Sequence, residues 1–402
     1  MIIVKKFGGS SVATPERIMN VARRCIEDYK AGHDVVVVLS AMGDTTDDLI
    51  AKAKEINEAP SRREMDMLMS TGEQISVALM AMAMDTLGVR AISLNAFQVA
   101  MHTTSTYSAA RLKRIDTERI MRELSDRRIV IVTGFQGVNR YDDVTTLGRG
   151  GSDTTAVAIA AALHADTCEI YTDVDGVYTA DPRIVPKARK LEEITYDEML
   201  DLASLGAGVL HNRSVELARK YGVRLIVRSS LNNSEGTVVK EKVKMERMLV
   251  SGVALDKDCD RIALIGLKNQ PGVAFKVFDL LAKAGINLDV IIQSIGRNDT
   301  KDISFTLPDD RLDEAVQILK DHQDRLDFES IDVEKDIAKL SIVGSGMMSN
   351  PGVAAKMFEA LYNANVNINM ISTSEIRVTV LIHKDEAVRA MNAVHDAFGL
   401  EE

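Results

Sequence analysis

The N-terminal part of the chain alternates short apolar segments with longer amphipathic ones. Such alternation predicts an α/β fold built on a mostly parallel sheet. Pro15 at the start of one amphipathic segment and Gly32 just beyond its end support helix bounds of 15–30. We expect strands at residues 2–6, 35–40, 129–133, 169–173 and 225–229, and helices at 15–30, 62–87 and 153–164.

A second constraint comes from an internal repeat in the C-terminal part. Pro271-Gly272-Val273-Ala274 recurs as Pro351-Gly352-Val353-Ala354, and the matching residues that follow keep the same spacing up to Ile291 and Ile371. Each copy reads as strand, Pro-Gly turn, helix, strand, strand, helix, which predicts two ferredoxin-like βαββαβ modules. The chain of 402 residues is long enough for these modules and a separate α/β domain.

Composition excludes several classes of function. A net charge of −10 disfavours general binding to nucleic acid or to an anionic membrane surface. The three cysteines lie far apart and form no metal-binding or disulfide pattern, which favours a reducing cytoplasm and predicts no protein metal site. We see no signal peptide and no apolar stretch of the roughly 20 residues that would span a bilayer.

Two glycine-rich runs have the character of anion sites. Lys6-Phe7-Gly8-Gly9-Ser10-Ser11 follows the first strand, and Gly148-Arg149-Gly150-Gly151-Ser152-Asp153 precedes a helix. Glycines between a strand and a helix let backbone N–H groups approach phosphate or carboxylate oxygens. Lys6 can act as a point charge on a phosphoryl group, and Arg149 as a planar fork for a carboxylate. Together they indicate phosphoryl transfer to a small acid.

Three further segments offer polar groups to a ligand. The hydroxyls of residues 40–47 either contact a ligand or cap the next helix. Glu73 lies in an apolar, methionine-rich helix and needs a cationic or hydrogen-bonding partner, for which a ligand ammonium is a candidate. Residues 172–183 supply carboxylates, an aromatic ring and an arginine, only partly explained by a turn at Asp175-Gly176. His102 and His211 have no partner pattern and are read as structural.

Taken in order, these motifs resemble those of the amino acid kinase family, in its aspartate-phosphorylating branch. The resemblance spans the whole chain and includes residues 70–73 and 134–137. It implies a three-layer αβα sandwich over residues 1–243, followed by two ferredoxin-like ACT domains at 248–335 and 336–402. Gly208 stands where many relatives carry a lysine, and Asn212 where they carry a proline, so a nucleotide contact from that lysine has no counterpart here.

The resemblance also implies a reaction and a set of roles. The γ-phosphate of ATP, with Mg²⁺ bridging its phosphates, would pass to the side-chain carboxylate of L-aspartate, the first step toward lysine, threonine and methionine. Lys6 and Asp153 would be catalytic. Substrate-binding positions would be Thr46, Glu73, Arg149, Gly150, Gly151 and Ser152; ATP-binding positions would be Lys6, Phe7, Gly8, Gly9, Ser40, Thr172, Asp173, Tyr178, Asp181 and Arg183.

Regulation and assembly are expected at the ACT domains. Inhibition by lysine, threonine or both is expected at a surface containing Asn269, Ala274, Asn287, Leu288, Asp289 and Gln293. The same domains would join copies of the chain into a homo-oligomer, and an internal start at Met245 or Met248 would give a shorter regulatory chain. Because the second repeat lacks a final strand, we expect residues 248–255 to cross over and complete its sheet.

Two alternatives remain at the level of the sequence. The fold is compatible with another acceptor, such as glutamate or a nucleoside monophosphate, although the pairing of Glu73 with Arg149 favours an amino acid. The chain is also compatible with a catalytically inactive amino-acid sensor, although Lys6, Arg149 and Asp153 are all present. ADP release with different acceptors would separate these possibilities.

Overall fold

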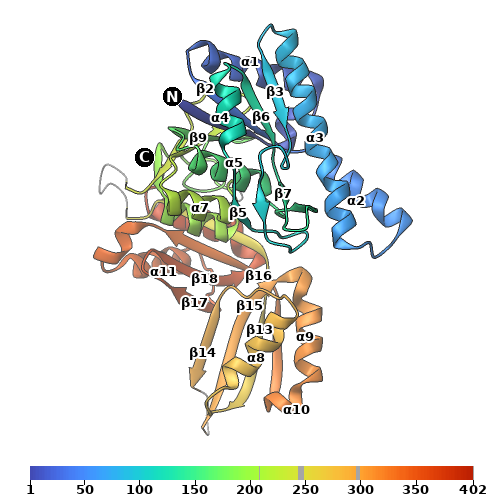
Figure 1. The fold of residues 1–402 in the computed structure, drawn as a ribbon. Helices are drawn as coiled ribbons and strands as arrows, with labels where there is room; N and C mark the ends of the chain where they lie inside the picture. Colours follow the sequence, from blue (N-terminus) through green and yellow to red (C-terminus); the bar gives the residue numbers. More distant parts are fainter. Residues whose placement is uncertain (208, 243–248, 296–298, 402) are drawn as a thin grey trace. The chain divides into compact units, whose positions relative to one another are not determined.

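The computed structural model describes residues 1–207, 209–242, 249–295 and 299–401, which form two compact units (Figure 1). The N-terminal unit comprises Met1–Tyr178, Lys190–Ser204 and Gly208–Met245. The C-terminal unit comprises Thr179–Arg189, Leu205–Ala207 and Glu246–Glu402. Two short segments from within the predicted catalytic range 1–243 thus belong to the C-terminal unit. The expected boundary at Val243, and the internal starts at Met245 and Met248, lie outside the described residues.

The N-terminal unit is built on an eight-stranded sheet with the order β10-β12-β11-β9-β1-β2-β6-β3. Strand β12 runs antiparallel to β11, and the other paired neighbours are parallel. The strands are β1 Ile2–Phe7, β2 Asp34–Leu39, β3 Ala91–Leu94, β6 Ile129–Thr133, β9 Thr167–Thr172, β10 Glu193–Thr195, β11 Leu225–Ser229 and β12 Thr237–Lys240.

Helices cover both faces of this sheet, as the three-layer prediction requires. Helices α1 (Pro15–Lys30) and α3 (Arg62–Thr86) pack on the face that carries Phe7 and Val37. Because successive strand residues point to opposite faces, Lys6 lies on the other face, where it meets α5 (Gly151–Ala162). The remaining helices are α2 Thr45–Ile56, α4 Glu118–Ser125, α6 Tyr196–Leu202 and α7 Asn212–Tyr221.

Local signals explain why some bounds agree with the sequence and others do not. Helix α1 has the predicted bounds because the Thr14 hydroxyl accepts a hydrogen bond from the Arg17 N–H at 3.3 Å, ahead of Pro15. Helix α5 begins earlier than predicted, directly after Gly150, whose φ is +66°. A small sheet of strands with two or three residues each escaped prediction: β4 His102–Thr103, β5 Leu112–Arg114, β7 Gln136–Val138 and β8 Val144–Thr146.

The C-terminal unit contains one six-stranded sheet with the order β14-β15-β13-β16-β18-β17. In β13 (Gly252–Lys268), Val253 pairs with Ile342 of the second repeat, whereas Ile262 pairs with Phe305 of the first. Strand β16 (Ser330–Val343) also serves both repeats, so the expected boundary at 335–336 falls inside a continuous strand. The other strands are β14 Ile291–Ile295, β15 Thr300–Pro308, β17 Met370–Thr373 and β18 Arg377–His383.

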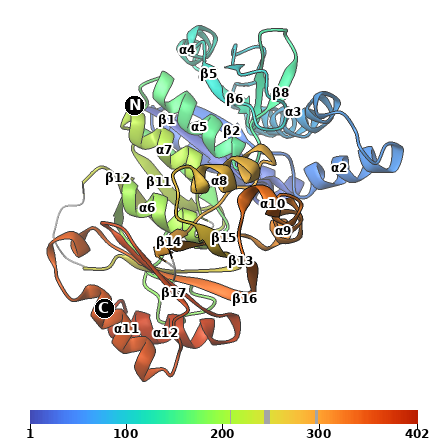
Figure 2. The same cartoon turned by 90° about the horizontal axis from the view of Figure 1, so that it is seen from below.

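The two repeats begin their first helices in the same way. Gly272 and Gly352, with φ of +89° and +93°, precede α8 (Val273–Lys283) and α11 (Val353–Asn363), so only glycine is unstrained there. Helices α11 and α12 (Ala387–Ala397) pack on the strands of the second repeat (Figure 2). Helices α9 (Leu312–Asp321) and α10 (Gln323–Leu326) accompany the first. Within the described residues, no helix combines the length and apolarity needed to cross a bilayer.

Candidate active site

The carboxyl ends of four parallel strands meet at one edge of the N-terminal sheet. Phe7, the last residue of β1, pairs with Leu39 at the end of β2 and with Tyr171 near the end of β9. Leu39 in turn pairs with Thr133 at the end of β6. The loops that follow these strands therefore begin side by side, and they contain most of the predicted site residues. Ligands of open α/β sheets bind at this edge.

Lys6 and Asp153 form an ion pair at this edge. The Lys6 Nζ lies 2.7 Å from the Asp153 Oδ1, and only about a tenth of each side chain is exposed. Among the described residues no hydrogen bond ends on that buried oxygen, so the attraction is electrostatic. A Cβ built on Gly8 would lie 3.5 Å from the Lys6 Nζ. The ammonium group is thus held next to the backbone of the first glycine run.

Gly9 permits a close approach between the first two loops. The Gly43 N–H donates to the Gly9 carbonyl at 3.0 Å, and a Cβ on Gly9 would lie only 2.7 Å from the Ala41 carbonyl oxygen. The Ser40 N–H donates to the Phe7 carbonyl at 3.2 Å, which places Ser40 directly beyond the first two strands. The side chain of Thr46 lies on the first turn of α2 and is half-buried.

Glu73 is a buried carboxylate with an unused oxygen. It projects from α3 with 3% exposure, and its Oε1 accepts a hydrogen bond from the Ala41 N–H at 3.2 Å. Its Oε2 is buried without a hydrogen-bond partner among the described residues. Burial raises the pKa of Glu73 to about 7, and the backbone N–H groups and the amide of Gln136 nearby offset only part of that effect. A bound ammonium group would supply the missing partner.

The second glycine run shapes the N-terminus of α5. Gly148 and Gly150 have φ of +78° and +66°, and Gly151 and Ser152 are buried in the first turn of the helix. A Cβ on Gly134 would lie 2.5 Å from the Ser152 Oγ, so the loop after β6 closely approaches this turn. Arg149 is exposed, and no contact of its side chain is recorded among the described residues. Free N–H groups at a helix start favour anions.

The predicted nucleotide residues fall into two groups. Thr172 and Asp173 follow β9 in the N-terminal unit, where the Thr172 hydroxyl donates to the Asp173 Oδ1 at 2.9 Å. Tyr178 donates from its hydroxyl to Asp175 at 2.7 Å. Asp181 and Arg183 lie in the segment that belongs to the C-terminal unit, and Arg183 donates to both carboxylate oxygens of Asp181 at 2.7–3.2 Å.

The predicted effector residues lie in the first repeat, but two of them already have partners. The Asn269 Nδ2 donates to Asp299 at 2.8 Å. Asp289, expected to offer an open carboxylate, lies 2.5 Å from the ammonium of Lys339, which also pairs with Asp256 at 2.8 Å. The other predicted positions are in α8 (Ala274), in the connection after it (Asn287 and Leu288) and on β14 (Gln293, exposed).

Two ionic side chains beside the second glycine run were missed by the sequence reasoning. Asp66, on α3, accepts hydrogen bonds from Ser108 and Thr146, and Arg213, on α7, donates to the carbonyls of Ala110 and Leu147. A signal for Asp66 existed, because it lies seven residues before Glu73 and therefore on the same face of an apolar helix. No sequence signal marked Arg213, because its partners are backbone carbonyls distant in sequence.

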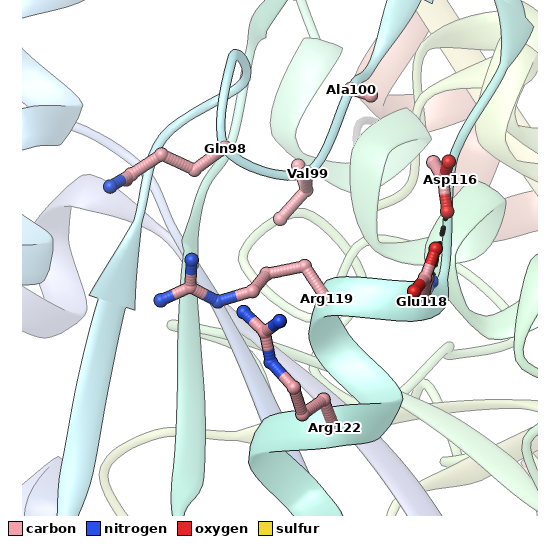
Figure 3. A pocket seen from close by; sticks show the side chains of 7 residues that line it. All are labelled: Gln98, Val99, Ala100, Asp116, Glu118, Arg119 and Arg122. Carbon is pink, nitrogen blue, oxygen red and sulfur yellow. Dashed lines mark hydrogen bonds between the residues drawn. The ribbon is translucent and has the colours of Figure 1, made fainter.

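A hollow of about 270 Å³ lies elsewhere in the N-terminal unit. Figure 3 shows the side chains of Arg119 and Arg122, from α4, pointing toward the loop at Gln98 and Val99. None of the predicted site residues lines this hollow. We therefore place the candidate active site at the sheet edge and not here.

Comparison with known proteins identifies the family of this chain. The model of the amino acid kinase family matches residues 1–229, and the ACT domain model matches residues 262–323 and 340–398. An aspartokinase of Bacillus sp. (strain MGA3) is 50% identical over 99% of this chain and 97% of its own length. An aspartokinase of Geobacillus stearothermophilus is 51% identical over 100% of this chain and 98% of its own length.

Solved structures give the same result. Aspartokinase III of E. coli in complex with aspartate and ADP has a TM-score of 0.84 at 26% identity, covering 99% of this chain and 100% of that one. The same enzyme with lysine and aspartate has a TM-score of 0.78, covering 99% of each chain. A kinase domain joined to two ACT domains defines the class. The chain belongs to the amino acid kinase family and, within it, to the aspartokinases.

Proposed function

We propose that this sheet edge transfers the γ-phosphate of ATP to the side-chain carboxylate of L-aspartate, giving 4-phospho-L-aspartate and ADP. The observation that supports this most is the joint presence of a buried lysine–aspartate pair and a buried carboxylate with a free oxygen. The first suits a phosphoryl group and the second suits the α-ammonium of an amino acid. A relative of known structure binds aspartate and ADP, in keeping with the proposal.

Aspartate would be held by its α-groups, so that its side chain faces the phosphate. Glu73 would accept hydrogen bonds from the α-ammonium, which satisfies its unpartnered Oε2. Arg149 would bind the α-carboxylate as a bidentate partner. Thr46 and Ser152 would add hydroxyl contacts, and Gly150 and Gly151, which carry no side chain, would let the substrate approach the backbone at the start of α5. Charge and shape together would then select an amino acid over a nucleotide acceptor.

The transfer step needs alignment and charge neutralisation, and it needs no general base. The side-chain carboxyl of aspartate has a pKa of about 3.9, so the nucleophile is ionised at neutral pH. Its oxygen attacks the γ-phosphorus, the bond to the β-phosphate oxygen breaks, and ADP leaves with that electron pair. Lys6 would offset the charge that two approaching anions share, and Asp153 would hold the ammonium in place.

Mg²⁺ fits this site as a partner of the ATP phosphates. The described residues contain no group of three side chains able to hold a metal ion alone. Magnesium commonly uses one or two carboxylates together with substrate phosphates, and the Asp153 carboxylate, which pairs with Lys6 through its Oδ1, is such a group. When bound, the ion would neutralise phosphate charge. Asp153 would contact it while keeping Lys6 oriented.

The nucleotide would extend from the glycine run along the neighbouring strand ends. Phe7, Gly8, Gly9 and Ser40 would line its phosphates. Thr172, Asp173 and Tyr178 would hold the remainder, as the family resemblance implies. The resemblance also implies nucleotide contacts from Asp181 and Arg183, which belong to the C-terminal unit. Gly208, which replaces a lysine of many relatives, lies outside the described residues.

The ACT domains would bind an end-product amino acid. Lysine, threonine or both would inhibit through Asn269, Ala274, Asn287, Leu288, Asp289 and Gln293; a related enzyme has been solved with lysine. Asp289 would pair with the effector ammonium in place of Lys339, which retains Asp256 as a partner. We further propose that copies assemble through these domains, and that a shorter chain starting at Met245 or Met248 serves as a regulatory partner.

An acceptor screen tests the proposal. ADP release from Mg-ATP is measured with L-aspartate, L-glutamate, UMP and no acceptor. ADP release that rises above background only when L-aspartate is the acceptor supports the proposed reaction. Turnover with glutamate or UMP identifies a different kinase, and equal background with every acceptor identifies a sensor without activity.

A further inference from the structure

We propose that Asp66 and Arg213 are positioning residues that hold the Arg149 loop in its aspartate-binding conformation. The inference rests on the proposed function, because it assigns these residues to the same substrate site. Neither side chain is predicted to touch the substrate. Their effect would reach it through the backbone that leads into Gly148.

Both carboxylate oxygens of Asp66 accept hydrogen bonds, and the donors come from two loops. It is fully buried on α3 and accepts hydrogen bonds from the Ser108 N–H at 2.9 Å and the Thr146 N–H at 2.8 Å. The hydroxyls of the same two residues donate to it at 3.2 and 2.8 Å. No ion pair of Asp66 is recorded within the described residues. Its negative charge is therefore stabilised by the groups that it holds, and such charge-assisted bonds are stronger than neutral ones.

Arg213 carries the opposite charge and holds the same two loops, one residue after Thr146 and two residues after Ser108. Its guanidinium donates to the Leu147 carbonyl at 2.7 Å and to the Ala110 carbonyl at 2.9 Å. In the part of the chain that the structure describes, this side chain also has no recorded ion pair. His211, two residues earlier, lies against the loop, since a Cβ on Gly150 would be 2.2 Å from the imidazole Cγ. The start of α7 thus supports the loop at Leu147 and at Gly150.

These contacts fix the backbone that leads into Arg149. The Ala110 N–H donates to the Thr146 carbonyl at 2.9 Å, and the Leu147 N–H donates to the Phe135 carbonyl at 2.8 Å. Arg149 is exposed and lacks a recorded side-chain partner of its own among the described residues, so the adjoining backbone sets its direction. A displacement of about 1 Å at a substrate-binding group can cost roughly a hundredfold in rate.

A merely stabilising role is the alternative, and a matched control separates the two. Arg24, on α1, donates to the carbonyls of Ser229 and Asn232, both at 2.6 Å. It has the same chemistry but holds another loop. The variants Arg213→Met, Arg213→Lys, Asp66→Asn and Arg24→Met are compared for aspartate Kd and number of sites by calorimetry with a non-hydrolysable ATP analogue, for KM of both substrates, and for Tm.

We expect Arg213→Met and Asp66→Asn to raise the Kd and KM for aspartate by about tenfold or more, with the number of sites unchanged and KM for ATP within about twofold. Arg213→Lys keeps the positive charge, so its Kd and KM for aspartate should lie between those of the wild type and Arg213→Met. If Arg213→Met fails to fold, Arg213→Lys provides the test. Arg24→Met should lower Tm without changing the Kd for aspartate. Wild-type Kd in folded Arg213→Met or Arg213→Lys protein would overturn the inference.

The variant Arg149→Ala distinguishes failure of this inference from failure of the proposed function. If Arg149→Ala binds aspartate like the wild type, the substrate role of the loop itself is wrong. If Arg149→Ala weakens aspartate binding and the Arg213 variants do not, only the positioning role is wrong.

Discussion

Replacement of Glu73 by glutamine tests the substrate site through its pH dependence. Burial raises the pKa of Glu73 from 4.5 to about 7, so the folded protein binds this proton more strongly than the unfolded chain does. The free energy of unfolding therefore falls as pH rises from about 4.5 to about 7 and is level above that range. At about 1.4 kcal/mol per pKa unit, the loss between about pH 5.5 and pH 8.5 is about 2 kcal/mol.

The measurement is urea unfolding of wild type and Glu73→Gln at several pH values. Subtracting the unfolding free energies of the two proteins removes the contribution of other titrating groups. From about pH 5.5 to pH 8.5, the wild type should lose about 2 kcal/mol of unfolding free energy relative to Glu73→Gln. Saturating aspartate should remove the shift, because the substrate ammonium stabilises the carboxylate. A difference that does not change with pH would refute the assignment of a raised pKa to this group.

The same residue predicts the pH dependence of binding. Only ionised Glu73 attracts an ammonium, so aspartate should bind the wild type about tenfold more weakly at about pH 6 than at about pH 8. In Glu73→Gln the affinity should be low and nearly constant over that range. Titration calorimetry in buffers matched for ionisation heat measures both.

Four other substitutions have distinct expected outcomes. Lys6→Ala should chiefly lower kcat, whereas Arg149→Ala should chiefly raise KM for aspartate; steady-state kinetics checks both, and wild-type activity in either removes its site assignment. Asp289→Ala should weaken inhibition by lysine or threonine by about tenfold, the scale of a lost charge-assisted contact, and unchanged inhibition curves for both would place the effector site elsewhere. Lys5→Met should cost about 3–5 kcal/mol in unfolding free energy, because it leaves buried Glu169 with one cation fewer, and Glu169→Gln in the same chain should recover part of it.

Much of the fold followed from local signals in the sequence. The bounds of α1 and β6 agree with the prediction because capping residues and a β-branched apolar run define them locally. The repeat predicted two equivalent helices, and both begin after a glycine with positive φ. Such features depend on neighbouring residues, so the sequence carries them directly.

Features that depend on distant residues could not be predicted in the same way. The residues on which segment 179–189 packs, such as Met391 and Val394, come from the far end of the chain. The lysine partner of Asp289 is likewise fifty positions away. Within the candidate site, Glu73 was identified because a carboxylate is unusual in an apolar helix. Arg213 was not, because the backbone carbonyls that it binds leave no trace in the pattern of side chains.

The most direct test of the account is the identity of the phosphorylated carboxylate. Protein, Mg-ATP and L-aspartate are incubated with hydroxylamine, which converts an acyl phosphate to a hydroxamate, and mass spectrometry locates the hydroxamate on the side-chain or the α-carboxyl group. If Arg149 and Glu73 hold the α-groups, the wild type should give the side-chain hydroxamate only. Hydroxamate on the α-carboxyl group, or none above the level without protein, would contradict the account.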